Sequence, residues 1–197
     1  MGESVRAVIA ARKGTLRPGD AVVLNNPFNG GTHLPDVTLV SPVFDEAGEE
    51  IRFFVANRAH HADIGGITPG SMPADSTSLA QEGIVIDDFL IVSAGEFREE
   101  ALRTLLLSGD HPARSPDVNI ADLKAQLAAN EAGARELEGL VARYGWPVIR
   151  CYTGHVMANA EESVRRVLDR IADGSFTYEM DDGAVLSACR SAIEVAA

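Results

Sequence analysis

The spacing of apolar residues changes part-way along this chain, and that change limits the folds open to it. Up to about Val92 the apolar residues come in short runs rich in Val, Ile, Leu and Phe, separated by glycine, proline and acidic residues, as in β-strands. From Phe97 onwards they recur every three or four residues, as on one face of a helix. The pattern predicts an α+β fold, with an antiparallel or mixed sheet from the N-terminal half packed against helices from the C-terminal half.

Individual elements follow from the same pattern. The expected strands are 21–26, 36–44 and 51–59, with a hairpin over 44–53, and a last strand without a partner at 175–180. The expected helices are 3–14, 97–109, 117–144 and 147–174, the third capped by Asp117 and the fourth closed by Gly174. Residues 60–82 form a long loop with three glycines and two prolines, and long loops inside compact segments are often functional.

Composition excludes several classes of function. The formal net charge is −12, whereas sequence-independent nucleic-acid binding relies on Lys and Arg to neutralise phosphates. The chain lacks both the roughly 18 consecutive apolar residues of a membrane span and the order of segments in a signal peptide, so we expect a cytoplasmic protein. Cys151 and Cys189 are too few for a disulfide framework; we expect reduced thiols, with Cys151 in the core.

The stretch GGTHLPDV, residues 30–37, places a histidine and an aspartate three positions apart behind two glycines. The glycines allow the chain to turn sharply and approach a ligand. Pro35 restricts its own φ and favours extended backbone before it, which would hold His33 and Asp36 at a fixed separation. Imidazole nitrogen and carboxylate oxygen together suit Mn, Fe(II), Zn or Co, so the two residues are candidate metal ligands.

A second stretch, RAHHADIGG at 58–66, contains three candidates for a further ligand, namely His60, His61 and Asp63. Extended backbone turns successive side chains to opposite faces, so we expect only one of the two histidines to join the same metal. The other would hydrogen-bond a ligand or a substrate. Taken alone, each stretch is also compatible with turn or structural roles, because an H-x-x-D pair is a weak signal.

Polar residues elsewhere are candidates for substrate binding. Asp122, Gln126 and Asn130 follow one another at i, i+4 steps and therefore line one stripe of the expected helix. The stripe is either a solvated face or a set of donors and acceptors for a polar substrate or a loop backbone. The turn before the H-x-x-D pair could bring Asn26 to the site. Arg58 could bind an anionic group of the substrate or form a structural ion pair.

Three long stretches resemble one known family. RPGDAVVLNNPFNGGTHLPDVTLVSPVF, ANRAHHADIGGITPGSMPADS and DLKAQLAANEAG are similar to the hydantoinase B and 5-oxoprolinase family, which also includes a large subunit of acetone carboxylase. The resemblance runs from about Ser4 to about Gly183. Full-length members are considerably longer, so we expect a fragment, a split subunit or a truncated member.

The resemblance implies a metal centre and a partner. Family members work with a hydantoinase A-type subunit that binds and cleaves ATP, and the acetone carboxylase branch holds manganese by two histidines and an aspartate. Carried over to this sequence, the ligands of a divalent metal (Mn, Zn or Fe) are His33, Asp36 and His60. His61 and Asp63 are then near neighbours, and either could act as a general base.

For a ring-opening member, the resemblance implies that the partner transfers a phosphoryl group from ATP to the amide oxygen of a hydantoin or 5-oxoproline. The metal would polarise the substrate or lower the pKa of a bound water. This chain has no G-x-x-x-x-G-K-[ST] loop, so we expect ATP to be handled by the partner and activity to require it.

Other functions stay open on the sequence alone: a ketone carboxylase subunit, a stand-alone enzyme with a two-histidine, one-carboxylate metal, or an inactive interaction fragment. We expect one hydantoinase B-like domain or fragment over 1–197, with a β-rich metal-site part (1–92), a helical part (93–174) and a terminal strand and tail (175–197). We also expect an oligomer, because exposed apolar edges favour association.

Overall fold

The computed structural model describes residues 1–172, 174–179 and 185–190, with residues 176 and 185–190 described by their backbone alone. The chain divides into two compact units, Met1–Glu138 and Gly139–Ala197. The first unit contains the strands β1 (Ala21–Leu24), β2 (Asp36–Phe44), β3 (Ile51–His60), β4 (Phe89–Ser93) and β5 (Glu96–Phe97). Its helices are α1 (Gly2–Ala11), α2 (Leu79–Glu82), α3 (Glu99–Leu106) and most of α4 (Pro116–Tyr144).

The five strands form one sheet in the order β3-β2-β1-β4-β5, and every pair in it is antiparallel. This confirms the expected α+β class. The hairpin between β2 and β3 turns at Asp45, whose carboxylate accepts the backbone N–H groups of Glu49 and Glu50. The sequence pattern located β1 to β3, but it missed β4 and β5; Phe97, expected to open a helix, belongs to β5, and α3 begins at Glu99.

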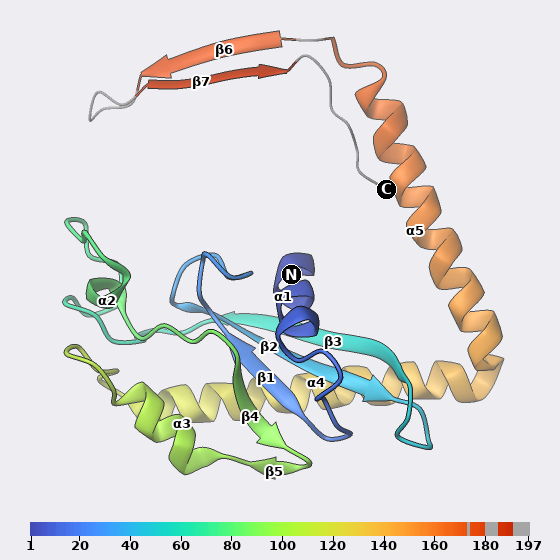
Figure 1. The fold of residues 1–197 in the computed structure, drawn as a ribbon, viewed down its shortest axis with the longest axis horizontal. Helices are drawn as coiled ribbons and strands as arrows, with labels where there is room; N and C mark the ends of the chain where they lie inside the picture. Colours follow the sequence, from blue (N-terminus) through green and yellow to red (C-terminus); the bar gives the residue numbers. More distant parts are fainter. Residues whose placement is uncertain (173, 180–184, 191–197) are drawn as a thin grey trace. The chain divides into compact units, whose positions relative to one another are not determined.

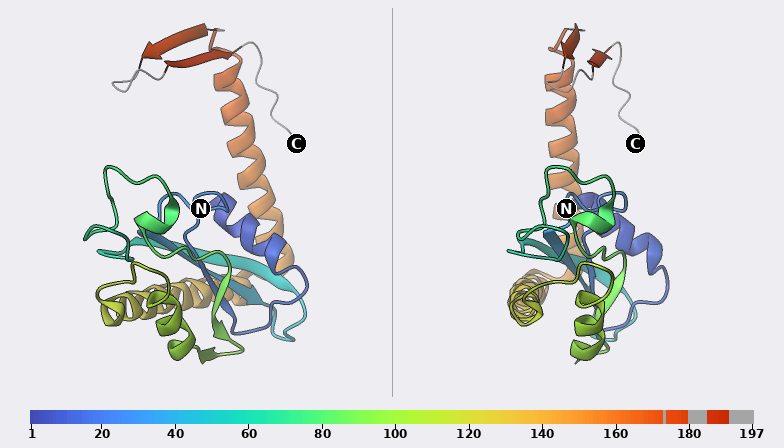
Figure 2. Two further views of the ribbon diagram at one scale, coloured as in Figure 1. Left: turned by 60° about the vertical axis from the view of Figure 1, so that its left-hand side comes forward. Right: turned by 90° about the vertical axis from the view of Figure 1, so that its left-hand side faces the viewer.

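Apolar side chains alternate along the strands, so the sheet buries a core on each face. Helix α1 covers one cluster, formed by Val8, Val22, Leu24 and Val40. Helices α3 and α4 cover a larger cluster on the other face, which includes Val23, Leu39, Ile91, Leu102 and Leu123. Figures 1 and 2 show α1 and α4 on opposite sides of the sheet. The helix expected at the N-terminus therefore packs on the sheet together with the helices from later in the chain.

Helix α4 differs from its expected form in two respects. It begins at Pro116 rather than after a cap at Asp117, because proline suits the first helical position. Its buried side chains are Asn119, Ile120, Leu123, Gln126 and Asn130. Leu140 and Tyr144, expected on the apolar face, are exposed. The face that packs on the sheet is therefore partly polar, and it is confined to the N-terminal half of the helix.

The second unit contains the end of α4, helix α5 (Trp146–Leu168), and the antiparallel pair β6 (Gly174–Glu179) and β7 (Val185–Arg190). Helix α5 ends before Gly174, which instead begins β6, so the expected helix end is wrong. The expectation of an unpaired final strand is also wrong, because β7 pairs with β6 over its whole length. Cys151 is exposed on α5 rather than in a core, and the side chain of Cys189 lies outside the described residues.

Among the described residues, none of the helices combines the length and the apolar character needed to cross a lipid bilayer.

The packing of α4 leads to a first prediction. Leu123 is fully buried between α4 and the sheet, whereas Leu140 on the same helix is 43% exposed. Leu123→Ala should lower the free energy of unfolding by about 2–5 kcal/mol through lost contacts and a cavity, and Leu140→Ala should change it by less than about 0.5 kcal/mol. Urea denaturation of both variants measures the difference. Equal effects would contradict the described packing of α4.

Candidate metal centre

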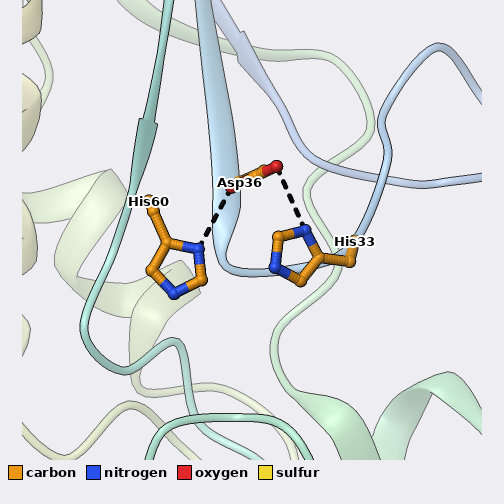
Figure 3. A group of neighbouring side chains, drawn as sticks. All are labelled: His33, Asp36 and His60. Atoms are coloured by element: carbon orange, nitrogen blue, oxygen red, sulfur yellow. Dashed lines mark hydrogen bonds and ion pairs between the residues drawn. The ribbon is translucent and has the colours of Figure 1, made fainter.

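Side chains from both histidine-containing stretches meet at one end of the sheet. One ligand atom from each of His33, Asp36 and His60 lies within 4.8 Å of the others. The Nδ1 atoms of the two histidines are each 3.1 Å from a different carboxylate oxygen of Asp36. Figure 3 shows the carboxylate between the two imidazole rings, whose centroids are 5.2 Å apart. Three donor groups that are 27 residues apart in sequence at most therefore form one cluster.

The strand register explains why the two stretches meet. Asp36 is the first residue of β2 and pairs with His60, the last residue of β3. Directly opposed side chains on antiparallel strands point to the same face, and here they lie beside each other. His33 comes from the turn just before β2. The cluster thus sits where a strand begins and its partner ends, on the face that α1 covers.

The turn before β2 is held by buried contacts. Asn25 is fully buried, and its amide donates to the carbonyls of Leu34 and Ile84 at 2.8 and 3.0 Å while its Oδ1 accepts the N–H of Ile86. A side chain at Gly31 would collide with the Asn25 and Asn26 carbonyls, so the turn requires glycine there. Asn25 fits the turn role suggested by sequence, and its many bonds show how the His33 segment is anchored.

Neighbouring groups keep Asp36 ionised. Burial acts to raise its pKa, but hydrogen bonds from Thr32 and His60 and the charges of His33 and His60 lower the pKa below its ordinary value. The Thr32 hydroxyl donates to Asp36 at 3.0 Å. An anionic carboxylate between two imidazoles is the form that a metal ligand requires.

Arg58 supports this arrangement from the neighbouring position on β3. Its guanidinium donates to the hydroxyls of Thr32, Thr38 and Ser4 at 2.8–3.2 Å. The Ser4 hydroxyl in turn donates to the carbonyl of Gly30, which ties α1 to the turn that carries His33. Arg58, expected as a substrate-binding group, therefore has three protein partners; its role toward a substrate stays a prediction.

His61 lies in a different environment from His60. It is fully buried, its Nδ1 lies 2.9 Å from Nδ2 of Asn119, and its Nε2 lies 3.2 Å from Oε1 of Gln126. Burial lowers the pKa of His61 and outweighs the Gln126 hydrogen bond and the charge of Asp122, which raise it. The expected division of roles between the two histidines matches the structure in direction: one joins the cluster and the other is turned inward.

Asp63 is held by the loop that it organises. Its carboxylate accepts the backbone N–H groups of Gly65, Gly70 and Arg114 and pairs with the Arg114 guanidinium at 2.7 Å. Burial acts to raise the pKa of Asp63, but these bonds, led by the Arg114 and Gly65 N–H groups, lower it overall. The 4.8 Å cluster includes neither Asp63 nor His61, and the catalytic role of both stays a prediction.

The polar stripe of α4 faces the sheet. Gln126 donates to the Val37 carbonyl and the Asn57 side chain, and Asn130 donates to the carbonyls of Leu39 and Val55 and to Ser41. Asp122 is half-buried nearby. Of the two expectations for this stripe, contact with backbone is the one seen for Gln126 and Asn130. Asn26 donates to Asp87 and accepts the N–H of Phe28, a turn role.

The donor set fits a divalent metal. Two imidazoles and one carboxylate converge from two loops, and three such ligands leave coordination positions for water or substrate. The side chains of His33 and His60 are 37% and 54% exposed, so the cluster is open on one side. A pocket of about 300 Å³ lies against His33 and is also lined by Pro35, Ser71, Met72, Pro73, Ala74 and Glu82.

Comparison with known proteins agrees with this site. The description Hydantoinase B/oxoprolinase belongs to the family whose profile matches residues 1–197. The chain belongs to the hydantoinase B/oxoprolinase family. A 5-oxoprolinase of Saccharomyces cerevisiae is 39% identical over 94% of this chain, which spans 15% of that relative. A protein of a Pseudomonas strain, named as a subunit of a putative D-/L-hydantoinase, is 28% identical over 90% of this chain and 29% of its own.

A solved structure has the same fold. The ATP-dependent caprolactamase from Pseudomonas jessenii superposes with a TM-score of 0.79 at 25% identity, covering 94% of this chain and 33% of that one. The chain therefore spans about a third or less of these relatives.

Sequence patterns missed several residues around the site. Thr32 and Ser4 connect Arg58 to the cluster, and Met72, Pro73 and Glu82 line the pocket beside it. A single hydroxyl in a loop gives no periodic signal, so only its partners reveal its role. The expected folding of the glycine-containing loop over the site did point to the segment that forms the pocket wall.

Asp63 provides a test of the loop. Asp63→Asn should lower the free energy of unfolding at pH 7 by about 1–3 kcal/mol, because the Arg114 pair and charge-assisted bonds weaken. The folded-state pKa is below the ordinary 3.8, so this stabilisation is present above pH 3.8 and is lost as the pH falls toward the folded-state value. Chemical denaturation between pH 3 and pH 7 should therefore show the gap to wild type closing in acid.

Asp75→Asn, at an exposed carboxylate in the same loop, is the matched control and should have little effect at any pH. A gap for Asp63→Asn that stays constant down to pH 3 would contradict the assigned role of its charge.

Proposed function

We propose that this chain carries the divalent-metal site of an ATP-dependent cyclic-amide hydrolase that opens hydantoin or 5-oxoproline rings together with a hydantoinase A-type subunit. The observation that carries the proposal is the convergence of His33, Asp36 and His60 within 4.8 Å. Relatives named 5-oxoprolinases, at 38–39% identity, support the reaction class. The relative named as one subunit of a hydantoinase supports the need for a partner.

In this proposal His33, Asp36 and His60 hold the metal. When bound, a divalent metal would supply Lewis acidity, which polarises a carbonyl or lowers the pKa of a coordinated water. Thr32 and Arg58 keep the Asp36 carboxylate anionic and oriented, since the hydroxyl donates to it and the guanidinium holds the hydroxyl. The ligands then need little rearrangement when the metal arrives.

The pocket beside His33 would hold the ring of the substrate. Its volume of about 300 Å³ matches the lower end of small-molecule sites. Pro35, Met72 and Pro73 offer apolar contact to ring carbons, and the Glu82 carboxylate offers an acceptor for a ring N–H. A small cyclic amide has this combination of an apolar ring and one polar edge. The phosphoryl donor would be ATP bound by the partner, which activates the amide oxygen as a leaving group.

Metal titration tests the ligand set. His33→Ala and His60→Ala should each weaken Mn²⁺ and Zn²⁺ binding by roughly a hundredfold or more, because even outer hydrogen-bond partners of metal ligands typically contribute 10–100-fold. Isothermal titration calorimetry of the purified chain measures both metals. His111→Ala, at an exposed loop histidine, is the control and should bind as wild type does. Unchanged affinity in His33→Ala would disprove the site.

Reconstitution tests the reaction. The chain, a hydantoinase A-type subunit, ATP and 5-oxoproline together should form glutamate by hydrolysis of the ring amide, and omission of ATP or of either protein should abolish product. Chromatographic detection of glutamate and of ADP measures both reactions. His33→Ala in the same mixture should form no product, and undiminished product formation in that variant would contradict a metal-dependent role for this chain.

A further inference from the structure

Two adjacent histidines have opposite surroundings, and the contrast bears on how the metal site is built. The His60 side chain is 54% exposed, whereas His61 is fully buried. Little protein packs around the His60 ring, so its place depends on Asp36 and on the backbone that carries it. Strand β3 ends at His60, so on the C-terminal side that backbone is held by whatever binds His61.

The ring of His61 is held at both nitrogens. Asn119 Nδ2 donates to the Asp63 carbonyl at 2.8 Å, which only an N–H group can do, so the same amide donates to Nδ1 of His61. Gln126 Nε2 donates to the Val37 carbonyl, which leaves its Oε1 as the acceptor for His61 Nε2–H. Both amides therefore select the same neutral tautomer, and the imidazole cannot rotate without losing both bonds.

The same residues reach the backbone on each side of Asp36. The His61 N–H donates to the Pro35 carbonyl at 2.8 Å. Gln126 Nε2 donates to the Val37 carbonyl at 3.1 Å. Asp36 thus lies between two carbonyls that are connected, directly or through His61, to one side chain of α4.

From these contacts we propose that Gln126 is a positioning residue for the metal centre, acting through His61 on the backbone of both ligand-bearing stretches. This inference rests on the proposed metal-binding function and assigns Gln126 and His61 a role without contact to metal or substrate. The exposed ligands are preorganised from the opposite face of the sheet, where α4 packs.

Asn130 provides a matched comparison. It lies one turn further along α4, is also buried, and also donates to backbone carbonyls of β2 and β3. Its partners on those strands, Leu39 and Val55, lie away from the strand ends that carry the ligands. Loss of Asn130 should therefore weaken the packing of α4 as much as loss of Gln126 does, but it should leave the ligand positions unchanged.

The experiment compares Gln126→Leu with Asn130→Leu in the full chain, by Mn²⁺ titration calorimetry and by urea denaturation. Both variants should lose stability to a similar degree, while Mn²⁺ affinity should fall about tenfold in Gln126→Leu only, the lower end of the range for outer partners of metal ligands. Equal Mn²⁺ affinity in the two variants would overturn the proposal.

A second pair keeps the test valid if Gln126→Leu does not fold. His61→Gln can still donate to Gln126 Oε1 from an amide that replaces Nε2, whereas His61→Leu cannot. We expect His61→Gln to bind Mn²⁺ within about threefold of wild type and His61→Leu to bind about tenfold more weakly. Similar losses in both would overturn the positioning role.

The outcomes separate this inference from the proposed function. If His33→Ala leaves Mn²⁺ affinity unchanged, the metal site itself is wrong. If His33→Ala abolishes binding while Gln126→Leu and Asn130→Leu bind Mn²⁺ equally well, the metal site stands and the positioning role is wrong.

Discussion

The pairing of Asp36 with His60 is the contact on which the rest of the site depends. An antiparallel register places the first residue of β2 against the last residue of β3, with both side chains on one face. A shift of one residue would turn Asp36 and His60 to opposite faces, and it would also turn the apolar residues of β2 out of their cores. The hydrophobic alternation that stabilises the sheet therefore also sets the geometry of the candidate metal ligands.

A buried polar layer between α4 and the sheet supports that register. Buried amides are stable only when their donors and acceptors are satisfied, and Gln126 and Asn130 meet this need with strand carbonyls and with Asn57. Apolar packing alone would allow a helix to slide along a sheet at small cost, whereas amides aimed at particular carbonyls restrict it to one position. The layer gives the helix a specific place at some expense in desolvation.

The candidate centre combines exposed ligands with buried supports. His33 and His60 are accessible, as a site that receives a substrate must be, while Asn25 and His61 beneath them are fully buried. This division fits the general need of metal sites for ligands held by outer hydrogen bonds. It also fits a chain that spans a small part of its relatives, because the described supports of the cluster all come from this chain.

The sequence by itself determined the α+β class, the positions of β1 to β3 and the two stretches that meet, because hydrophobic period and turn chemistry are local properties. It also indicated that adjacent histidines would part, since alternation in a strand is local as well. Only the tertiary structure decided which way the Gln126 and Asn130 stripe faces, that α4 buries polar rather than apolar residues there, and that β6 has a partner. The physical reason is that a polar stripe on a helix is equally compatible with water and with strand carbonyls. The choice between them is made by neighbours that are distant in sequence.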